Sequence, residues 1–256
     1  MTVSSAPATT SASSGSLAGK VAIITGGGSG IGRAIAMAFA AEGVKVAVAG
    51  RRREKLDETV VAIAQAGGTA LAVPTDVAIE DQVLRLFAAT QSAWGRLDIL
   101  VNNAGGFAGA PTDEFPLQMW KDMIDANLTG AFLCCREAFR IMKAQRSGRI
   151  INIGSTSAKV PRPKSAAYAA SKWGLDGLTR MLAIEAREFG VAVSIIHPGN
   201  TIPGVWTGQE DKVKHEGLMD ASNVARIAVL VASLPAEANL YESIVLPVSM
   251  PFLGRG

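Results

Sequence analysis

The sequence predicts an α/β fold in which helices cover both faces of a mainly parallel, seven-stranded sheet. Short runs rich in Val and Ile alternate along the chain with longer stretches of helical patterning. The runs are almost continuously apolar, as strands buried on both faces usually are. With 256 residues, 48% of them hydrophobic, the chain can form one large domain with a sizeable core.

Each expected strand is one of these short apolar runs. Helical stretches lie between them, as a parallel sheet requires. We expect the strands at Val21–Thr25, Val44–Ala49, Thr69–Val73, Ile99–Asn102, Arg149–Ile153, Val191–Ile196 and Ser243–Val248.

The expected helices have apolar residues at helical spacing. Several end at a glycine, as at Gly43, Gly67 and Gly190, where left-handed backbone suits a helix cap. We expect the helices at Gly30–Glu42, Glu54–Ala66, Glu80–Trp94, Pro116–Gln145, Ala166–Phe189 and Ser222–Leu234.

The first 16 residues, MTVSSAPATTSASSGS, carry no charge. They lack the basic start of a signal peptide and the arginines of a transit peptide, so we expect a disordered arm at residues 1–16. Residues 17–256 are expected to form the folded domain. No apolar segment reaches the roughly 18 residues of a membrane span, and we expect a cytoplasmic protein without membrane contact.

Charge, cysteines and histidines argue against several function classes. The net charge is +3, but the basic residues are scattered apart from Arg51–Arg53, which disfavours nucleic-acid binding. The two cysteines, Cys134 and Cys135, are adjacent in an apolar stretch and are best interpreted as small buried hydrophobes. His197 and His215 belong to no Cys/His cluster, so no metal site is expected.

The first strand is followed by a glycine-rich stretch, TGGGSGIG, with five glycines between Gly26 and Gly32. It fits neither G-x-G-x-x-G nor the G-x-x-x-x-G-K phosphate loop, but Gly26, Gly30 and Gly32 give T-G-x-x-x-G-x-G. In such folds ligands bind outside the carboxyl ends of the strands. The backbone amides of this stretch and the N-terminus of the following helix would face a pyrophosphate there. The alternative is a tight turn that merely needs positive φ.

The chemistry-bearing residues follow the fifth expected strand. Ser155 stands at its carboxyl end, and Tyr168 and Lys172 are spaced to share one helical face. A nearby ammonium favours the phenolate, so Lys172 would lower the pKa of Tyr168 and suit it to acid–base work. The alternatives are a half-exposed Tyr–Lys pair and a serine that only forms a turn.

Six motifs, from about Leu17 to Val248, show that the chain resembles the short-chain dehydrogenase/reductase family, in its conventional subclass. They are TGGGSGIG, NNAG at Asn102–Gly105, NLTG at Asn127–Gly130, INIGS ending at Ser155, YAASK at Tyr168–Lys172 and HPG at His197–Gly199. The resemblance implies a Rossmann-type doubly wound domain and an NAD(P)-dependent oxidoreductase that interconverts a secondary alcohol and a ketone. The alternative is a catalytically inactive nucleotide-sensing or scaffold protein, which would need no proton-transfer groups.

The resemblance assigns four catalytic residues. Tyr168 would be the acid/base, and Ser155 would orient the substrate oxygen. Lys172 would hold the nicotinamide ribose and lower the pKa of Tyr168. Asn127 would bind a water that links Lys172 to solvent, although a helix-interior Asn can also simply bond a backbone carbonyl.

The resemblance also implies a cofactor site. Asp76 and Val77 would meet the adenine, unless Asp76 only caps the next helix, and Asn103 would lie under the adenosine ribose. The backbone after Pro198 would contact the nicotinamide carboxamide. The implied cofactor-binding residues are Gly26, Ser29, Gly30, Ile31, Gly32, Arg51, Arg52, Asp76, Val77, Asn103, Ala104, Gly105, Tyr168, Lys172, Pro198, Gly199 and Thr201.

The chain departs from the family pattern after HPG. Pro203 stands where the family has the Thr of P-G-x-x-x-T, and Thr201 is the substitute that we expect. A substrate lid is expected at about residues 200–219, together with the Gly106–Pro111 loop. Phe107, Trp206 and Met219 would make the pocket partly apolar.

The stretch GRRREK after the second strand favours NADP(H), with NAD(H) possible. NAD-preferring relatives place an acid where this chain has Gly50. Arg51 and Arg52 precede a helix start, which disfavours cations, so a bound 2′-phosphate would explain them. Ser29 weakens the case for NADP(H), because NADP-binding relatives often have a basic residue at this position. The resemblance also implies a homotetramer or homodimer.

Overall fold

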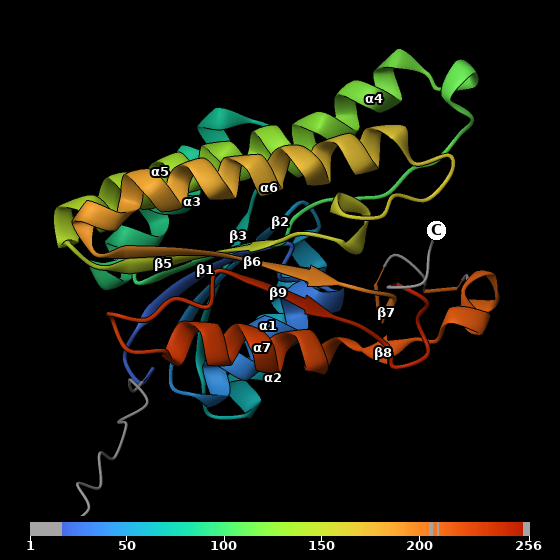
Figure 1. Cartoon of the computed structure of the whole chain (residues 1–256). Helices are drawn as coiled ribbons and strands as arrows, with labels where there is room; N and C mark the ends of the chain where they lie inside the picture. Colours follow the sequence, from blue (N-terminus) through green and yellow to red (C-terminus); the bar gives the residue numbers. More distant parts are fainter. Residues whose placement is uncertain (1–16, 205–206, 209, 253–256) are drawn as a thin grey trace, which may run out of the picture.

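The computed structural model describes residues 17–204, 207–208 and 210–252. The arm expected at residues 1–16 lies outside these ranges. Seven strands form one sheet in the order β3-β2-β1-β4-β5-β6-β9, and every neighbouring pair is parallel. Helices cover both faces (Figure 1). The predicted Rossmann-type doubly wound fold is confirmed.

The strands lie where the Val- and Ile-rich runs predict them. The main sheet contains β1 (Val21–Thr25), β2 (Lys45–Gly50), β3 (Thr69–Pro74), β4 (Ile99–Asn102), β5 (Gly148–Ile153), β6 (Val191–Pro198) and β9 (Glu242–Val245). The last strand ends at Val245, not at the predicted Val248, because Pro247 has no N–H for a sheet hydrogen bond and instead accepts one in a turn from Met250.

Five of the seven α-helices in the described ranges match the predicted ones closely. The helices are α1 (Gly30–Ala41), α2 (Arg53–Gln65), α3 (Glu80–Trp94), α4 (Leu117–Ile124), α5 (Gly130–Gln145), α6 (Ala166–Ala186) and α7 (Ala221–Ser233). The single helix predicted over Pro116–Gln145 is wrong in one respect. A π-helical turn, Asp125–Thr129, separates α4 from α5, and it contains Asn127.

The two faces of the sheet carry separate core layers. On one face Ile24 packs with Phe39 of α1 and Val224 of α7. On the other face Ile23 packs with residues of α3 and α5. Successive side chains of a strand point to opposite faces, so the continuous apolar run of β1 supplies both layers. Both cysteines are buried in the second layer, and burial raises the pKa of Cys135 to about 12.

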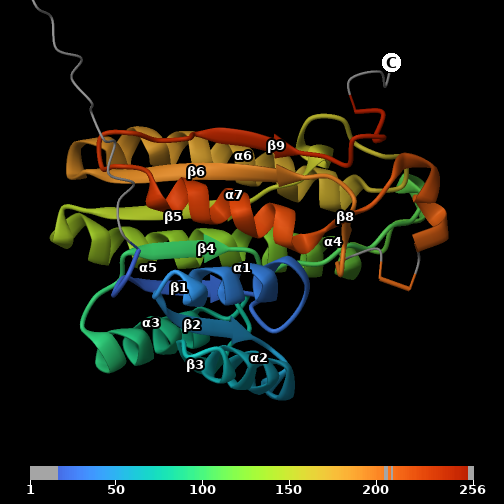
Figure 2. The ribbon, with the colours of Figure 1, turned by 90° about the horizontal axis from the view of Figure 1, so that it is seen from below.

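The strand order reverses between β1 and β4. The chain runs outward from β1 through β2 to β3, then returns to place β4 on the other side of β1 (Figure 2). Loops that leave β1 and β4 therefore diverge at the carboxyl edge of the sheet and open a crevice there. Within the described ranges, none of the helices is long and apolar enough to span a membrane.

Candidate active site

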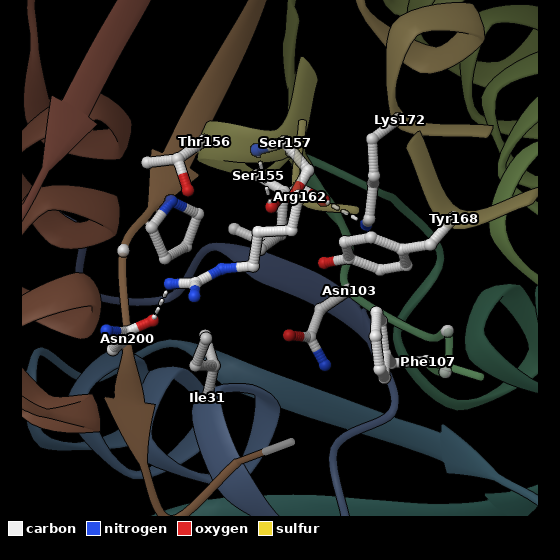
Figure 3. Close-up of a pocket in the computed structure, with 16 residues that line it drawn as sticks. Ile31, Asn103, Phe107, Ser155, Thr156, Ser157, Arg162, Tyr168, Lys172 and Asn200 are labelled. Atoms are coloured by element: carbon white, nitrogen blue, oxygen red, sulfur yellow. Dashed lines mark hydrogen bonds between the residues drawn. The ribbon is translucent and has the colours of Figure 1, made fainter. Parts of the chain in front are cut away.

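Two adjoining cavities lie at the carboxyl edge of the sheet. The larger has a volume of about 530 Å³ and the smaller about 130 Å³. Gly105, Gly106 and Phe107 line both, so the two form one crevice. The larger cavity brings together the expected residues Gly26, Ser29, Arg51, Arg52, Asp76, Val77, Ala104 and Gly105. The smaller adds Ile31, Asn103, Ser155, Tyr168, Lys172, Pro198 and Gly199 (Figure 3).

Four expected residues do not line these cavities: Gly30, Gly32, Asn127 and Thr201. Gly30 and Gly32 lie in the first turn of α1. Thr201 lies in the short strand β7 (Thr201–Ile202), and its hydroxyl donates to the carbonyl of Gly199 at 2.9 Å. Its side chain therefore stabilises the turn after β6.

The glycine turn depends on bare backbone at two points. Gly26 has a φ of 68°, in the left-handed region. A Cβ on Gly32 would lie 2.3 Å from the carbonyl oxygen of Gly26, so α1 can approach the turn only without a side chain there. The first turn of α1 contains no acidic residue, and Ser29 makes no capping hydrogen bond. The amides at this helix start are thus suited to an anion.

A brace between β1 and β4 holds this turn. The hydroxyl of Thr25 accepts hydrogen bonds from the amides of Asn103 (3.0 Å) and Ala104 (2.9 Å). The side-chain amide of Asn103 donates back to the carbonyl of Thr25 at 3.0 Å. Asn103 therefore fixes the glycine turn, in addition to lining the smaller cavity. Thr25 opens the TGGGSGIG motif, but the sequence pattern alone assigns it no role.

The three arginines after β2 divide between two environments. Arg51 and Arg52 line the larger cavity, and Nη2 of Arg52 lies 3.4 Å from the hydroxyl of Ser29. Arg53 begins α2 and pairs with Asp57 at 3.0 Å. Only the first two arginines face the crevice.

Asp76 and Val77 line the larger cavity after β3. One carboxylate oxygen of Asp76 accepts from the amide of Ala78 at 3.1 Å, which closes a tight turn. The residue that precedes α3 is Ile79, so Asp76 does not cap that helix. The backbone amide of Asp76 is held by the side chain of Gln82 at 2.8 Å.

Ser155, Tyr168 and Lys172 converge at the end of β5, as their spacing predicts. The Nζ of Lys172 donates to the carbonyl of Ile153 at 2.8 Å and lies 5.8 Å from the ring centre of Tyr168. The ring of Phe107 meets that of Tyr168 edge-on at 5.2 Å. The hydroxyl of Ser155 accepts from the amide of Ser157 at 3.1 Å.

Burial shifts both titratable groups toward their neutral forms. It lowers the pKa of Lys172 to about 8. It also raises the pKa of Tyr168, although a hydrogen bond with Ser155 opposes the rise. The pKa of Tyr168 is therefore raised overall, and not lowered as we expected from Lys172. Burial of the phenol is the largest influence on this pKa.

The π-helical turn places Asn127 behind the smaller cavity. Its Oδ1 accepts from the amide of Gly106 at 2.8 Å, and its Nδ2 donates to the Gly106 carbonyl at 3.0 Å and to the Ser171 hydroxyl at 3.1 Å. The π-turn and this binding thus occur together, as they often do at functional sites.

The expected lid begins and ends in short strands that pair with each other. These strands are β7 and β8 (Met219–Asp220). Arg162, which lines the smaller cavity, binds both carboxylate oxygens of Glu216 and lies 3.1 Å from Oδ1 of Asn200. Arg162 belongs to none of the six motifs, so the sequence pattern does not predict its place in the cavity.

The expected apolar pocket residues have three different outcomes. Phe107 lines the crevice. Met219 does not, because it packs into the core against α7. Trp206 lies outside the described residues.

Comparison with known proteins gives consistent matches. Residues 20–213 match the family model described as short chain dehydrogenase. The chain is 41% identical over 184 residues to a 3-oxoacyl-(acyl-carrier-protein) reductase of Synechocystis sp., covering 72% of this chain and 74% of the relative. It is 42% identical over 185 residues to 3beta-hydroxysteroid dehydrogenase 1 of Eggerthella lenta, covering 72% and 71%.

A solved structure adds a likeness over nearly the whole fold. It is a metagenomic short-chain oxidoreductase in complex with NADP. The TM-score is 0.81 at 34% identity, over 91% of this chain and 99% of that one.

Proposed function

The chain belongs to the short chain dehydrogenase family, and from this premise we propose that it is an NAD(P)-dependent oxidoreductase that interconverts a secondary alcohol and a ketone. The observation that carries the proposal is the convergence of Ser155, Tyr168 and Lys172 on one cavity that continues into the larger one. The Synechocystis and Eggerthella relatives are named for different substrates, an acyl thioester and a steroid. The likeness thus supports the reaction type without selecting a substrate.

The crevice residues fit an extended dinucleotide. The glycine turn and the start of α1 would hold the pyrophosphate, and Asp76 and Val77 would meet the adenine. Lys172 would hold the nicotinamide ribose, with the backbone after Pro198 at the carboxamide. The bound cofactor supplies or accepts the hydride.

The protein's own groups handle the substrate oxygen and the proton. In the reducing direction, the hydroxyl of Ser155 donates a hydrogen bond to the ketone oxygen, and the hydroxyl of Tyr168 transfers its proton to that oxygen. Burial raises the pKa of Tyr168, which favours the protonated phenol before the transfer. In the oxidising direction, the phenolate of Tyr168 accepts the alcohol proton, and the Lys172 ammonium, 5.8 Å from the ring centre, offsets part of the cost of a buried phenolate. Asn127 would connect Lys172 to solvent through a bound water.

The larger cavity favours NADP(H) over NAD(H). Arg51 and Arg52 line it together with Lys55, which pairs with Glu58, and Gly50 offers no carboxylate to a ribose hydroxyl. Arg52 also lies beside Ser29, which brings a cation to the place where the family often has a basic residue. The metagenomic relative solved with NADP supports the same choice.

Exposed apolar side chains on one face support a homodimer or homotetramer. The helices α4, α5 and α6 form one layer over the sheet (Figure 1). They expose Leu117, Phe132, Trp173 and Ile184, and the exposed fraction of the Ile184 side chain is 66%. We propose that a second copy of the chain covers this face.

We expect Tyr168→Phe to lower kcat by about 10²- to 10⁴-fold, since only the proton-transfer oxygen is lost. The assay is NADPH oxidation with a panel of ketones, including sugars, keto esters, steroids and acyl thioesters. The matched control is Tyr241→Phe, at the chain's second tyrosine. This variant should keep wild-type turnover. A Tyr168→Phe enzyme within tenfold of wild type would refute the acid–base role. No turnover by the wild type on any substrate would favour the nucleotide-sensing or scaffold alternative.

The double variant Gly50→Asp/Arg51→Leu should reverse the cofactor preference. A Cβ on Gly50 would meet only the Leu56 side chain at 3.5 Å, so the new carboxylate fits. We expect the ratio of kcat/KM for NADPH to that for NADH to fall at least tenfold. Arg53→Leu is the control, because Arg53 pairs with Asp57. The phosphate-reading role is wrong if wild type prefers NADH, or if the double variant keeps its preference.

Sedimentation should show a dimer or tetramer at micromolar concentration. Charged substitutions at Phe132 and Ile184, each to Glu, should shift it toward monomer, because they place charges in an apolar interface. Val61→Glu is the control, since Val61 is similarly exposed but lies on α2. A monomeric wild type would contradict the assembly.

A further inference from the structure

His197 is a buried titratable side chain beside the candidate active site, and the proposed mechanism does not use it. It lies near the end of β6, and its side chain is 0% exposed. Residues two apart on a strand share a face, and Ile195 packs against Leu175 of α6. His197 thus points into the layer between the sheet and α6.

One ring nitrogen of His197 faces the backbone of Ser155. Nδ1 lies 3.2 Å from the amide nitrogen and 2.9 Å from the carbonyl oxygen of Ser155. A neutral imidazole has one donor and one acceptor nitrogen. A protonated Nδ1 donates to the carbonyl, and an unprotonated Nδ1 accepts from the amide. The ring therefore holds Ser155 in either tautomer.

The approach of the ring requires a glycine before Ser155. A Cβ on Gly154 would lie 2.5 Å from Nδ1 of His197. The glycine of the INIGS motif thus admits the imidazole to the Ser155 backbone. Ser155 itself is extended, with φ −167° and ψ 153°.

The other ring nitrogen lies beside Glu242, which belongs to a network of charged groups on three elements. Nε2 lies 3.4 Å from Oε1 of Glu242, the first residue of β9. Lys159, four residues after Ser155, binds Glu242 at 2.7 Å and Asp176 of α6 at 2.9 Å. Arg180 of α6 lies within 3.7 Å of Glu242. Burial lowers the pKa of His197, which keeps the ring neutral at neutral pH.

We propose that His197 is a positioning residue that fixes the Ser155 peptide through Nδ1, and so aims the Ser155 hydroxyl at the substrate oxygen. The inference rests on the proposed function, because it assigns Ser155 to the substrate. The side chain lies among three neighbouring strands: Ser155 follows β5, His197 is the penultimate residue of β6 and Glu242 begins β9. Misplacing a reacting group by about 1 Å can cost about 10²-fold in rate.

Two amide substitutions separate the two ring nitrogens. In His197→Asn the side-chain amide occupies the place of Nδ1 and keeps a partner for Ser155. In His197→Gln the amide reaches the place of Nε2, toward Glu242, and leaves Ser155 unheld. We expect Asn to keep at least half of wild-type kcat and Gln to lower kcat about tenfold or more. The KM for NADPH and the melting temperature should differ little between the two.

A double-mutant cycle tests whether His197 acts through Ser155. On a Ser155→Ala background, His197→Gln should have little further effect on the residual turnover. Equal kcat for the Asn and Gln variants would overturn the inference, and so would a Gln effect that is undiminished without the Ser155 hydroxyl. If the Gln variant does not fold, Gly154→Ala perturbs the same contact and should lower kcat, with Gly177→Ala, whose Cβ would meet nothing within 4 Å, as its control.

A measurement that needs no substrate distinguishes a failure of this inference from a failure of the proposed function. A wild type inactive on every ketone would refute the proposed function. A crystal structure of the His197→Gln protein would still decide the positioning role. The inference expects the Ser155 backbone to be displaced, and an unchanged Ser155 would contradict it.

Discussion

The hydrogen bond from Lys172 to the carbonyl of Ile153 joins the two halves of the candidate site. Ile153 ends β5 immediately before Gly154 and Ser155, and Lys172 lies one turn after Tyr168 on α6. This bond therefore sets the distance between the strand that carries the serine and the helix that carries the tyrosine. Lys172 is only 6% exposed, and its ammonium donates to a neutral carbonyl rather than to a carboxylate. Its positive charge is left for the groups in the crevice.

The burial of Lys172 has a cost that depends on pH. Its pKa falls from 10.5 to about 8, so the folded protein loses this proton at a lower pH than the unfolded chain does. The unfolded chain binds more protons between these values, and the contribution of Lys172 to stability becomes more favourable as the pH rises from about 8 to 10.5. Below pH 8 the ammonium is buried at a free-energy cost. Such a cost is typical of groups placed for function.

The sequence was sufficient to predict the fold, and most of the residues proposed for the site line one crevice, because strand periodicity and motif spacing are local patterns. Strand periodicity and the spacing of Tyr168 and Lys172 are properties of short segments. The features that the sequence did not predict depend on contacts between distant segments. The π-turn at Asn127 accompanies a bond to Gly106, and the brace at Thr25 depends on Asn103. Likewise, the pKa of Tyr168 is raised because the folded chain buries the phenol.

The most direct test of the role of Lys172 is the titration of its amine in the folded protein. Lysine labelled with ¹³C at Cε reports the charge of Nζ by NMR, and Lys172→Met identifies the resonance. The account predicts a midpoint near 8, well below the ordinary 10.5. A midpoint near 10.5 would show a hydrated ammonium that is not held at the end of β5, and would contradict the organisation of the site around the Lys172–Ile153 bond.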